Sequence, residues 1–365
     1  MRIVIAGYYG YHNWGDEGAL ATLLRGLSED AQAHRMDKAH RATITVLSGD
    51  PAFTEQTYGV CTLPRMDLRA VRRAIRNSDA LILGGGSLLQ DATSLRSLLY
   101  YLALIRWGLS AHGKVLLVGQ GIGPLRRWIS RRFVRTTLRK VPFLSVRDAE
   151  SAQLLRTIGV SHATVDADLT WALTAHPPHV PLDADARWIG LAPRAWRDAP
   201  VQEAFTALCR QIRADGYTPL LIPMQESQDR ALCEAIATAS DARILPSPNH
   251  PAQLLGVMQR LQGMVAMRLH GAIFAAAQGT PVLCVSYDPK VDALASQLHA
   301  PRIALAQIAT ELLQVWQAFH TQHAILHEQI KRNTMPLRQR ATALIERVNA
   351  FIEDSFERRA TQTAL

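Results

Sequence analysis

The sequence predicts an α/β protein built from two Rossmann-like halves. Short apolar runs ending in glycine-rich or polar turns alternate with longer segments of helical periodicity, which is typical of βαβ units around a parallel sheet. The 365 residues suffice for two hydrophobic cores, with 48% of them hydrophobic and 19% charged. We therefore expect two domains facing a cleft, with the carboxyl ends of both sets of strands directed toward it.

Each half contains six expected strands. In the first half they lie at 2–6, 43–47, 79–83, 114–118, 142–146 and 162–165. Helical periodicity between them predicts helices at 17–28, 67–77, 95–112 and 149–157. In the second half the strands lie at 188–192, 218–222, 242–245, 263–267, 281–285 and 301–304.

A proline-rich stretch at 174–187 separates the halves. Pro177, Pro178 and Pro181 remove backbone donors and stop regular structure, which favours a linker. We expect an N-terminal domain at 1–175, a C-terminal domain at 187–345, and a helical or frayed tail at 346–365.

The chain is basic. Lys and Arg number 40 against 31 Asp and Glu, so the formal net charge is +9. This charge favours anionic ligands, an anionic membrane face or nucleic acid, although the chain has no recognised nucleic-acid module. In residues 126–140, arginines at 127, 131, 135 and 139 recur on one face of an expected helix. That helix is either a solvated basic face or a surface that docks on an anionic inner membrane leaflet.

The sequence favours a cytoplasmic protein. The cysteines at 61, 209, 233 and 284 are scattered, so we interpret them as core residues in a reducing compartment. The chain opens on the apolar strand MRIVIAGYYG without the features of a signal peptide. Its longest apolar run, Leu98 to Ile105, is far shorter than the roughly 20 residues of a membrane-spanning helix. No group of residues has metal-ligand spacing, so we expect no metal cofactor.

The first candidate site segment is GYYGYHNWGDEGAL, residues 7–20, after the first strand. Gly7, Gly10 and Gly15 let the backbone turn tightly and approach a ligand. Asp16 either caps the helix that follows or takes part in catalysis, and Glu17 follows it. The glycine spacing does not match the dinucleotide fingerprint, which disfavours a nicotinamide cofactor.

The second candidate segment is LILGGGSLLQD, residues 81–91. A buried strand runs into Gly84, Gly85, Gly86 and Ser87, whose bare amides and hydroxyl suit an anion or a sugar hydroxyl. A close-packed turn would use the same residues. The similar segment VGQGIGPL, at 118–125, favours a tight turn.

Arginines end two further strands. In FLSVRDAESAQLL, Arg147 follows a strand and Asp148 is expected to cap the next helix, with Ser151 three residues on. Arg147 either grips a carboxylate or phosphate or forms a salt bridge to a neighbouring loop. The same alternatives apply to Arg194 in IGLAPRAW.

The most informative segment is MVAMRLHGAIFAAAQGTPVLCVSYDPK, residues 264–290. A buried strand is followed by Arg268, Leu269 and His270 at the start of a helix. Guanidinium and imidazole together can bind an anion and move a proton near neutral pH. The alternative is an ion pair beside a helix-capping histidine. Lys290, after the next strand, could add a third positive group.

Five of these segments resemble, in this order, the polysaccharide pyruvyl transferase family, particularly its CsaB-type bacterial members. They are GYYGYHNWGDEGAL, LGGGSLLQD, GQGIGP, SVRD and MRLHGAIFAAAQGTPV, across residues 7–282. The resemblance implies a glycosyltransferase-B-like fold. It also implies transfer of pyruvyl from phosphoenolpyruvate to two hydroxyls of a hexose in a cell-surface polysaccharide precursor, with release of phosphate and no cofactor.

The resemblance also implies roles for individual residues. Arg268, Leu269 and His270 match the R-L-H motif that holds phosphoenolpyruvate and moves a proton in this family. Further donor-site candidates are Arg147, Arg194 and Lys290. Beside these, the residues themselves suggest either Asp16 or Glu17 as the acceptor-side base, and Gly85, Gly86 and Ser87 as further substrate-binding candidates. The segment DADLTW at 166–171 departs from the Asp-Pro that the family has there.

Two other functions share this pattern of loops and basic residues. One is a glycosyltransferase of the same fold that uses a nucleotide sugar. The other is a glycan-binding protein without catalytic activity. Binding of the donor separates the first from a pyruvyl transferase, and acceptor-dependent release of phosphate separates the second.

Overall fold

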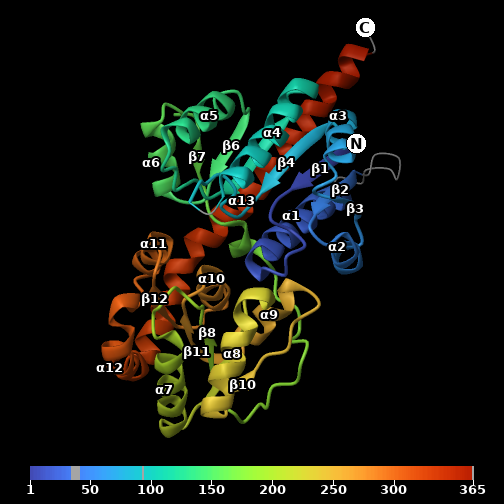
Figure 1. The fold of residues 1–365 in the computed structure, drawn as a ribbon. Coiled ribbons are helices and arrows are strands. Elements are labelled where there is room, and N and C mark those ends of the chain that lie inside the picture. The colour runs from blue at the N-terminus through green and yellow to red at the C-terminus, as the bar shows by residue number, and fades with distance from the viewer. Residues whose placement is uncertain (34–41, 93, 364–365) are drawn as a thin grey trace. The chain divides into compact units, whose positions relative to one another are not determined.

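The computed structural model describes residues 1–33, 42–92 and 94–363, and it divides the chain into two compact units. The first unit comprises Met1–Tyr11, Asp16–Leu173 and Gln339–Leu365, and the second comprises His12–Gly15 and Thr174–Arg338. Each unit contains one parallel sheet with helices packed on it (Figure 1). The predicted α/β class with two Rossmann-like sheets is confirmed.

The first sheet has the strand order β3-β2-β1-β4-β5-β6-β7, which reverses at β1. Its strands are β1 (Arg2–Ala6), β2 (Thr43–Ser48), β3 (Cys61–Pro64), β4 (Ala80–Gly84), β5 (Val115–Gln120), β6 (Phe143–Val146) and β7 (Thr164–Val165). The six expected strands are all present. β3 was not predicted; it is a short edge strand that ends in proline, a residue that is disfavoured in the interior of a sheet.

The helices of the first unit follow these strands. They are α1 (Trp14–Ala33), α2 (Pro51–Tyr58), α3 (Leu68–Asn77), α4 (Leu95–Ala111), α5 (Trp128–Leu138), α6 (Ala149–Thr157) and the 3₁₀ turn η2 (Leu169–Ala172). Asp148 caps α6 by accepting a hydrogen bond from Ser151 N at 2.7 Å, as predicted. The predicted capping role of Asp16 is wrong, because α1 begins at Trp14 and Asp16 lies within its first turn.

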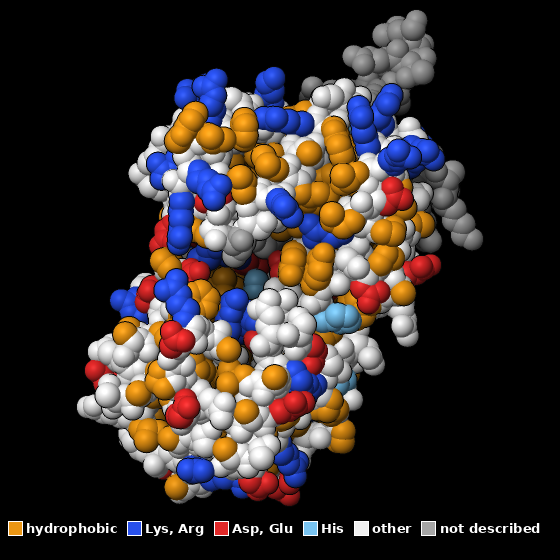
Figure 2. All heavy atoms as spheres, viewed as in Figure 1, with side chains coloured by type: hydrophobic (Ala, Val, Ile, Leu, Met, Phe, Trp, Pro, Cys, Tyr) orange, Lys and Arg blue, Asp and Glu red, His pale blue; other side chains and the backbone are white. Residues whose placement is uncertain are grey.

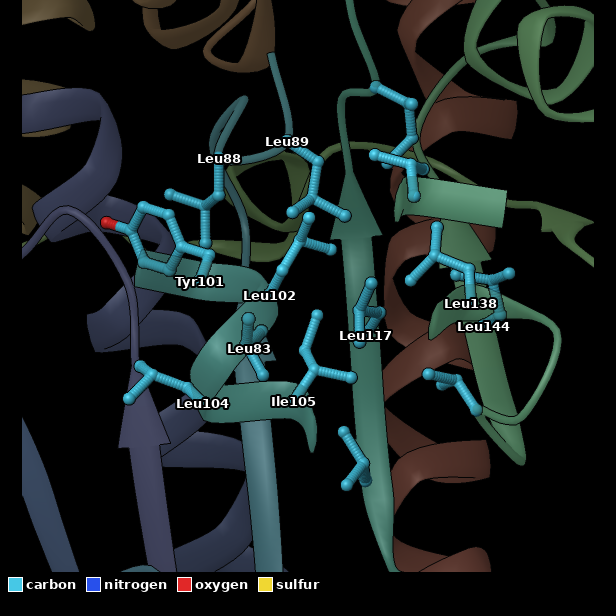
Figure 3. Packing of buried hydrophobic residues seen from close by; sticks show 14 of the residues in the cluster. Leu83, Leu88, Leu89, Tyr101, Leu102, Leu104, Ile105, Leu117, Leu138 and Leu144 are labelled. Atoms are coloured by element: carbon cyan, nitrogen blue, oxygen red, sulfur yellow. The ribbon is translucent and has the colours of Figure 1, made fainter. Parts of the chain in front are cut away.

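Two hydrophobic layers enclose the first sheet. On one face the buried side chains of α3, α4, α5 and α6 pack on the strands. Figure 3 shows Leu102 and Ile105 of α4 beside Leu83 of β4 and Leu117 of β5. On the other face the strands pack against α1 and the C-terminal helix.

The second sheet has the order β10-β9-β8-β11-β12-β13, which reverses at β8. Its strands are β8 (Trp188–Ala192), β9 (Thr218–Leu221), β10 (Arg243–Ile244), β11 (Leu261–Ala266), β12 (Val282–Ser286) and β13 (Arg302–Ala304). All six were expected, each within two residues of these bounds. The helices are α7 (Val201–Ala214), α8 (Glu226–Ser240), α9 (Pro251–Met258), α10 (Leu269–Ala277), α11 (Pro289–Leu298), α12 (Ile308–Thr321) and the turn η3 (Leu305–Gln307).

The segment between the sheets and the C-terminal helix complete the fold. Residues 174–187 form neither helix nor strand, and the N–H of His176 donates to the carbonyl of Ala252 at 3.0 Å. Helix α13 (His323–Thr363) belongs to the second unit up to Arg338 and to the first from Gln339. The predicted second domain extends to residue 345, whereas Leu344 already packs on the first sheet.

Three of the four cysteines lie in the core. Cys209, Cys233 and Cys284 are buried, as predicted, whereas Cys61 is exposed because it begins the edge strand β3. Burial raises the pKa of Cys209 to about 11, so this thiol stays protonated at neutral pH. None of the described helices is both long and apolar enough to cross a bilayer.

Glu17 anchors the loop between β1 and α1. Its carboxylate is fully buried and accepts hydrogen bonds from Gly10 N at 2.8 Å and Tyr58 Oη at 3.0 Å. The hydroxyl of Tyr101 donates to the carbonyl of Gly7 at 3.0 Å. Burial raises the pKa of Glu17 to about 7, more than these hydrogen bonds lower it.

The burial of Leu344 predicts that the C-terminal helix stabilises the first unit. Leu344→Ala leaves a cavity against the first sheet, so it should lower the free energy of unfolding by about 2–5 kcal/mol. Chemical denaturation measures this loss. Glu346→Ala, on the exposed side of the same helix, should change stability by less than about 0.5 kcal/mol, and equal effects of the two variants would contradict the packing.

The raised pKa of Glu17 predicts a pH dependence of stability. Between pH 4.5 and about 7 the folded protein holds a proton that the unfolded chain has released, so stability falls as pH rises through this window. Glu17→Gln removes this term. Across the window, wild type should lose on the order of 2 kcal/mol relative to the variant. Denaturation at pH 5 and pH 8 tests this, with Glu55→Gln on the exposed side of α2 as the control; parallel wild-type and Glu17→Gln curves would refute it.

Candidate active site

In the first unit, the candidate residues lie at one edge of the sheet. Asp16 follows β1, Gly85, Gly86 and Ser87 follow β4, and Arg147 follows β6. β1, β4, β5 and β6 are consecutive neighbours in the parallel sheet, so their carboxyl ends lie at the same edge. The order reverses at β1, which is where parallel α/β sheets bind ligands.

Arg147 is held by three side chains, which we call with it the Ser87–Arg147 cluster. Its Nη1 donates to Asp168 Oδ2 at 2.9 Å, its Nη2 to Ser87 Oγ at 3.2 Å, and its Nε to Asp148 Oδ2 at 3.4 Å. Burial alone would lower the pKa of Arg147, but Asp168 and Asp148 outweigh it and raise the pKa. The salt-bridge alternative for Arg147 is therefore realised in the structure.

The glycine turn after β4 brings Asp16 to this cluster. Gly85 and Gly86 have φ values of +64° and +69°, which favour glycine. A Cβ at Gly86 would lie 2.6 Å from Asp16 Oδ1, so the bare backbone leaves room for the carboxylate. Gln120 Nε2 braces the turn by donating to Gly85 O at 2.7 Å.

The charge around Arg147 is negative overall. One guanidinium faces the carboxylates of Asp148 and Asp168 directly, and the charge of Asp16 also acts on it. Such a group of carboxylates and a serine hydroxyl offers hydrogen-bond acceptors, which suit the hydroxyls of a neutral ligand better than an anion.

In the second unit, the candidate residues again lie at one sheet edge. Arg194 follows β8, Arg268 follows β11, and Lys290 follows β12, while α8 follows β9. These strands are consecutive neighbours in the order β9-β8-β11-β12. The reversal of strand order at β8 places this edge at the second unit's own switch point.

Arg268 forms a buried ion pair with Asp229. Its Nε donates to both carboxylate oxygens, at 3.2 and 3.0 Å, and its Nη2 lies 2.5 Å from Oδ1. Asp229 is fully buried and also accepts a hydrogen bond from the backbone N–H of Gln225 at 2.9 Å. The plane of the Arg268 guanidinium is therefore fixed.

A second arginine joins this pair through Gln228. Gln228 Oε1 accepts from Arg268 Nη2 at 3.0 Å and makes a longer contact of 3.5 Å with Arg194 Nη2. Arg194 Nη1 donates to Tyr287 Oη at 2.9 Å. We call Arg194, Gln228, Asp229, Arg268 and Tyr287 the arginine cluster. It holds two guanidinium groups against one buried carboxylate.

His270 lies at the start of α10, directly after this cluster. The N-cap of α10 is Arg268, which makes no side-chain capping hydrogen bond, so the helix-capping interpretation of His270 is wrong. The imidazole is partly exposed and packs against Gly15, which belongs to the same unit. A Cβ at Gly15 would lie 1.9 Å from His270 Nδ1.

The remaining candidates have different surroundings. Leu269 is partly exposed as the first residue of α10. Lys290 is partly exposed in the first turn of α11, and its N–H donates to the capping carboxylate of Asp288 at 3.0 Å. Glu17 is enclosed by the loop that it anchors, so its carboxylate has no exposed surface for a ligand.

The partners of the two buried arginines were not predicted from the sequence. Asp168 caps η2 within DADLTW, and Asp229 and Gln228 lie in the first turn of α8. Each of these residues follows a strand whose neighbour in the sheet is followed by an arginine. That position in the sequence could have identified them as partners of the arginines. Within residues 1–33, 42–92 and 94–363, no group of three or more His, Cys, Asp or Glu side chains could hold a metal ion.

The fold is similar to those of several solved structures. A putative UDP-N-acetylglucosamine 2-epimerase from Listeria monocytogenes has a TM-score of 0.65 at 12% identity, over 98% of this chain and 97% of that one. The S. aureus MnaA–UDP co-structure gives 0.62 at 12% identity over 95% of each chain. CalG4, the calicheamicin glycosyltransferase, gives 0.53 at 13% identity over 98% of each chain. These likenesses confirm the glycosyltransferase-B-like fold.

Sequence comparison assigns the family. Curated proteins give no significant match to the chain. The family model described as polysaccharide pyruvyl transferase matches residues 35–289, which is 255 of the 365 residues. With more than half of its length matched in this way, the chain belongs to the polysaccharide pyruvyl transferase family.

Proposed function

We propose that this protein transfers a pyruvyl group from phosphoenolpyruvate to two hydroxyls of a hexose in a cell-surface polysaccharide precursor, forming a ketal and releasing phosphate. Membership of the family supports transfer of pyruvyl to a polysaccharide. The observation that carries the choice of donor is the arginine cluster, in which Gln228 contacts both Arg194 and Arg268.

The charges of the second unit suit phosphoenolpyruvate. This donor carries a carboxylate and a phosphate, so its site needs several cations. Asp229 compensates the guanidinium of Arg268, whereas the guanidinium of Arg194 contacts two neutral groups, Tyr287 Oη and Gln228 Oε1. Lys290, in the first turn after the neighbouring strand β12, adds another positive group at the same edge. We therefore assign the donor to the second unit.

The first unit suits the sugar acceptor. Ser87 and the carboxylates of the Ser87–Arg147 cluster present acceptors to hydroxyl groups, and the cluster has no excess of positive charge that would attract an anion. Gly86 keeps its backbone close to Asp16. We assign Asp16 as the base that takes a proton from an acceptor hydroxyl. Arg147 acts by positioning Ser87.

The proposed reaction balances without a cofactor. His270 donates a proton to the methylene carbon of phosphoenolpyruvate, which becomes a methyl group and leaves positive charge at C2. The first sugar hydroxyl bonds to C2 and releases its proton to Asp16. The bond between C2 and the phosphate oxygen then breaks, and the second hydroxyl bonds to C2 and closes the ketal. The proton of that hydroxyl leaves with phosphate or returns to His270.

A glycosyltransferase of this fold that uses a nucleotide sugar is the rival function. The S. aureus MnaA structure, which has a similar fold, contains UDP. A nucleotide donor carries a base and a ribose that need their own contacts in addition to its phosphates. The arginine cluster instead brings positive charges close together, which suits the small, doubly anionic phosphoenolpyruvate. Binding of the two donors therefore separates the functions directly.

Arg194→Ala should weaken binding of phosphoenolpyruvate by roughly 10- to 100-fold, because each hydrogen bond to a charged group contributes about 1.5–3 kcal/mol. Titration calorimetry measures this with phosphoenolpyruvate, UDP-sugars and CDP-sugars. Arg197→Ala is the matched control, since Arg197 is exposed on the same loop. Tight binding of a nucleotide sugar, with phosphoenolpyruvate silent, would make the protein a glycosyltransferase.

His270→Ala should lower kcat by about 100- to 10,000-fold, the usual contribution of a positioned acid or base, while phosphoenolpyruvate still binds. Gly15→Ala should lower kcat as well, because a methyl group there would displace the imidazole. Acceptor-dependent release of phosphate measures turnover. A His270→Ala enzyme with most of its activity would remove His270 from the mechanism. A wild-type protein that binds glycan without releasing phosphate would be a glycan-binding protein.

A further inference from the structure

Three neighbouring helices on one face of the first unit form a basic surface. Helices α3, α4 and α5 lie on the same face of the first sheet, and α4 packs against both of the others. They contain four, two and three arginines respectively, and none contains Asp or Glu. All nine of these arginines are exposed, as are the basic residues at 126, 127, 139 and 140. We call the exposed side chains of these helices and of residues 126–127 and 139–140 the basic face.

The buried side chains of each helix explain why the arginines point outward. α3 buries Val71 and Ile75, and α5 buries Val134 and Leu138, all within the core beneath the face. Since these apolar positions recur at helical spacing, the intervening arginines lie on the opposite side. The hydrophobic core therefore holds the helices of the basic face in place.

Exposed hydrophobic side chains lie among the arginines. The described residues include nine large hydrophobic side chains that are exposed, and five of them lie on these helices or just before α3. They are Met66, Leu68, Leu99, Trp128 and Ile129, and Trp128 has the highest exposed fraction of the nine at 72%. Figure 2 shows hydrophobic and basic side chains interspersed over this part of the molecule.

We propose that the basic face docks on a bilayer that contains anionic phospholipids. Arginines attract the anionic headgroups, and their aliphatic stems together with exposed Trp and Leu side chains enter the boundary between headgroups and acyl chains. A nucleic acid would satisfy the arginines, but its phosphates would leave the side chains of Trp128, Ile129 and Met66 without apolar partners. The mixture of charge and apolar surface therefore favours the bilayer.

This inference goes beyond the proposed function, because it gives a role in membrane binding to residues far in sequence from the arginine cluster. Binding to the bilayer does not require phosphoenolpyruvate. The inference also extends the expectation for residues 126–140 alone. If α3 and α5 act as one surface, a change on α3 should weaken binding as a change on α5 does. Vesicle binding is measured without substrate, so its failure leaves the pyruvyl transfer proposal untouched.

The test is sedimentation of the full-length protein with vesicles of phosphatidylcholine, with and without phosphatidylglycerol. Wild type should bind only the anionic vesicles. Each basic residue near an anionic surface contributes about fivefold to binding, so the two positive charges lost in Arg73→Glu with Arg132→Glu should weaken it by at least roughly 25-fold. Trp128→Ala should weaken binding with the charge unchanged. The matched control is Arg332→Glu with Arg340→Glu and Met335→Ala, which are exposed positions on α13, and this variant should keep most of the binding.

Three outcomes would overturn the proposal. Equal binding to neutral and anionic vesicles would show that the charge has no role. Equal losses in the basic-face and α13 variants would show that net charge, not this surface, controls binding. Binding to a duplex oligonucleotide that requires Arg73 and Arg132, with vesicle binding absent, would assign the face to nucleic acid. Circular dichroism of each variant verifies that it is folded.

Discussion

The buried ion pair between Arg268 and Asp229 is the constraint on which the candidate donor site depends. Asp229 is fully buried, and an unpaired carboxylate in that position would destabilise the fold by several kcal/mol. Arg268 supplies the compensating charge through two nitrogens, which fixes its own orientation. The pair also joins the start of α8 to the end of β11, and this places Gln228 where it contacts Arg194 as well. One buried carboxylate thus aligns two guanidinium groups.

In the first unit, a buried arginine is neutralised by its neighbours and leaves no positive charge for a ligand. Arg147 also follows a strand and also bonds to aspartates, but Asp148 and Asp168 together outnumber it. These two carboxylates neutralise the charge of Arg147, and its hydrogen bond to Ser87 Oγ orients that hydroxyl. An arginine at a strand end therefore does not by itself identify an anion site. The balance of neighbouring carboxylates decides whether charge remains for a ligand.

The sequence predicted the strands and the loops that bear the candidate residues, because both depend on local patterns. Of the thirteen strands in the described part of the chain, twelve follow from short apolar runs bounded by glycine or polar residues. The partners of the arginines depend on tertiary structure instead. Asp168 is 21 residues from Arg147, and Asp229 is 39 residues from Arg268, and each lies on the segment that follows another strand. For the same reason the return of α13 to the first sheet and the burial of Glu17 were not predicted.

The segment Asn13–Glu17 was recognised in the sequence as a motif, but the separate roles of its residues appear only in the structure. Asn13 forms a β-bridge with Gln225, whereas Asp16 lies beside Gly86 and Glu17 anchors the loop. The sequence suggested that Gly15 serves a tight turn, but Gly15 is not among the glycines with positive φ, so its backbone does not require glycine. The requirement is space, since any side chain there would occupy the position of the His270 imidazole. Under the proposed mechanism, Gly15 is needed because it leaves space for the imidazole of His270, the proton donor, and not because of its backbone conformation.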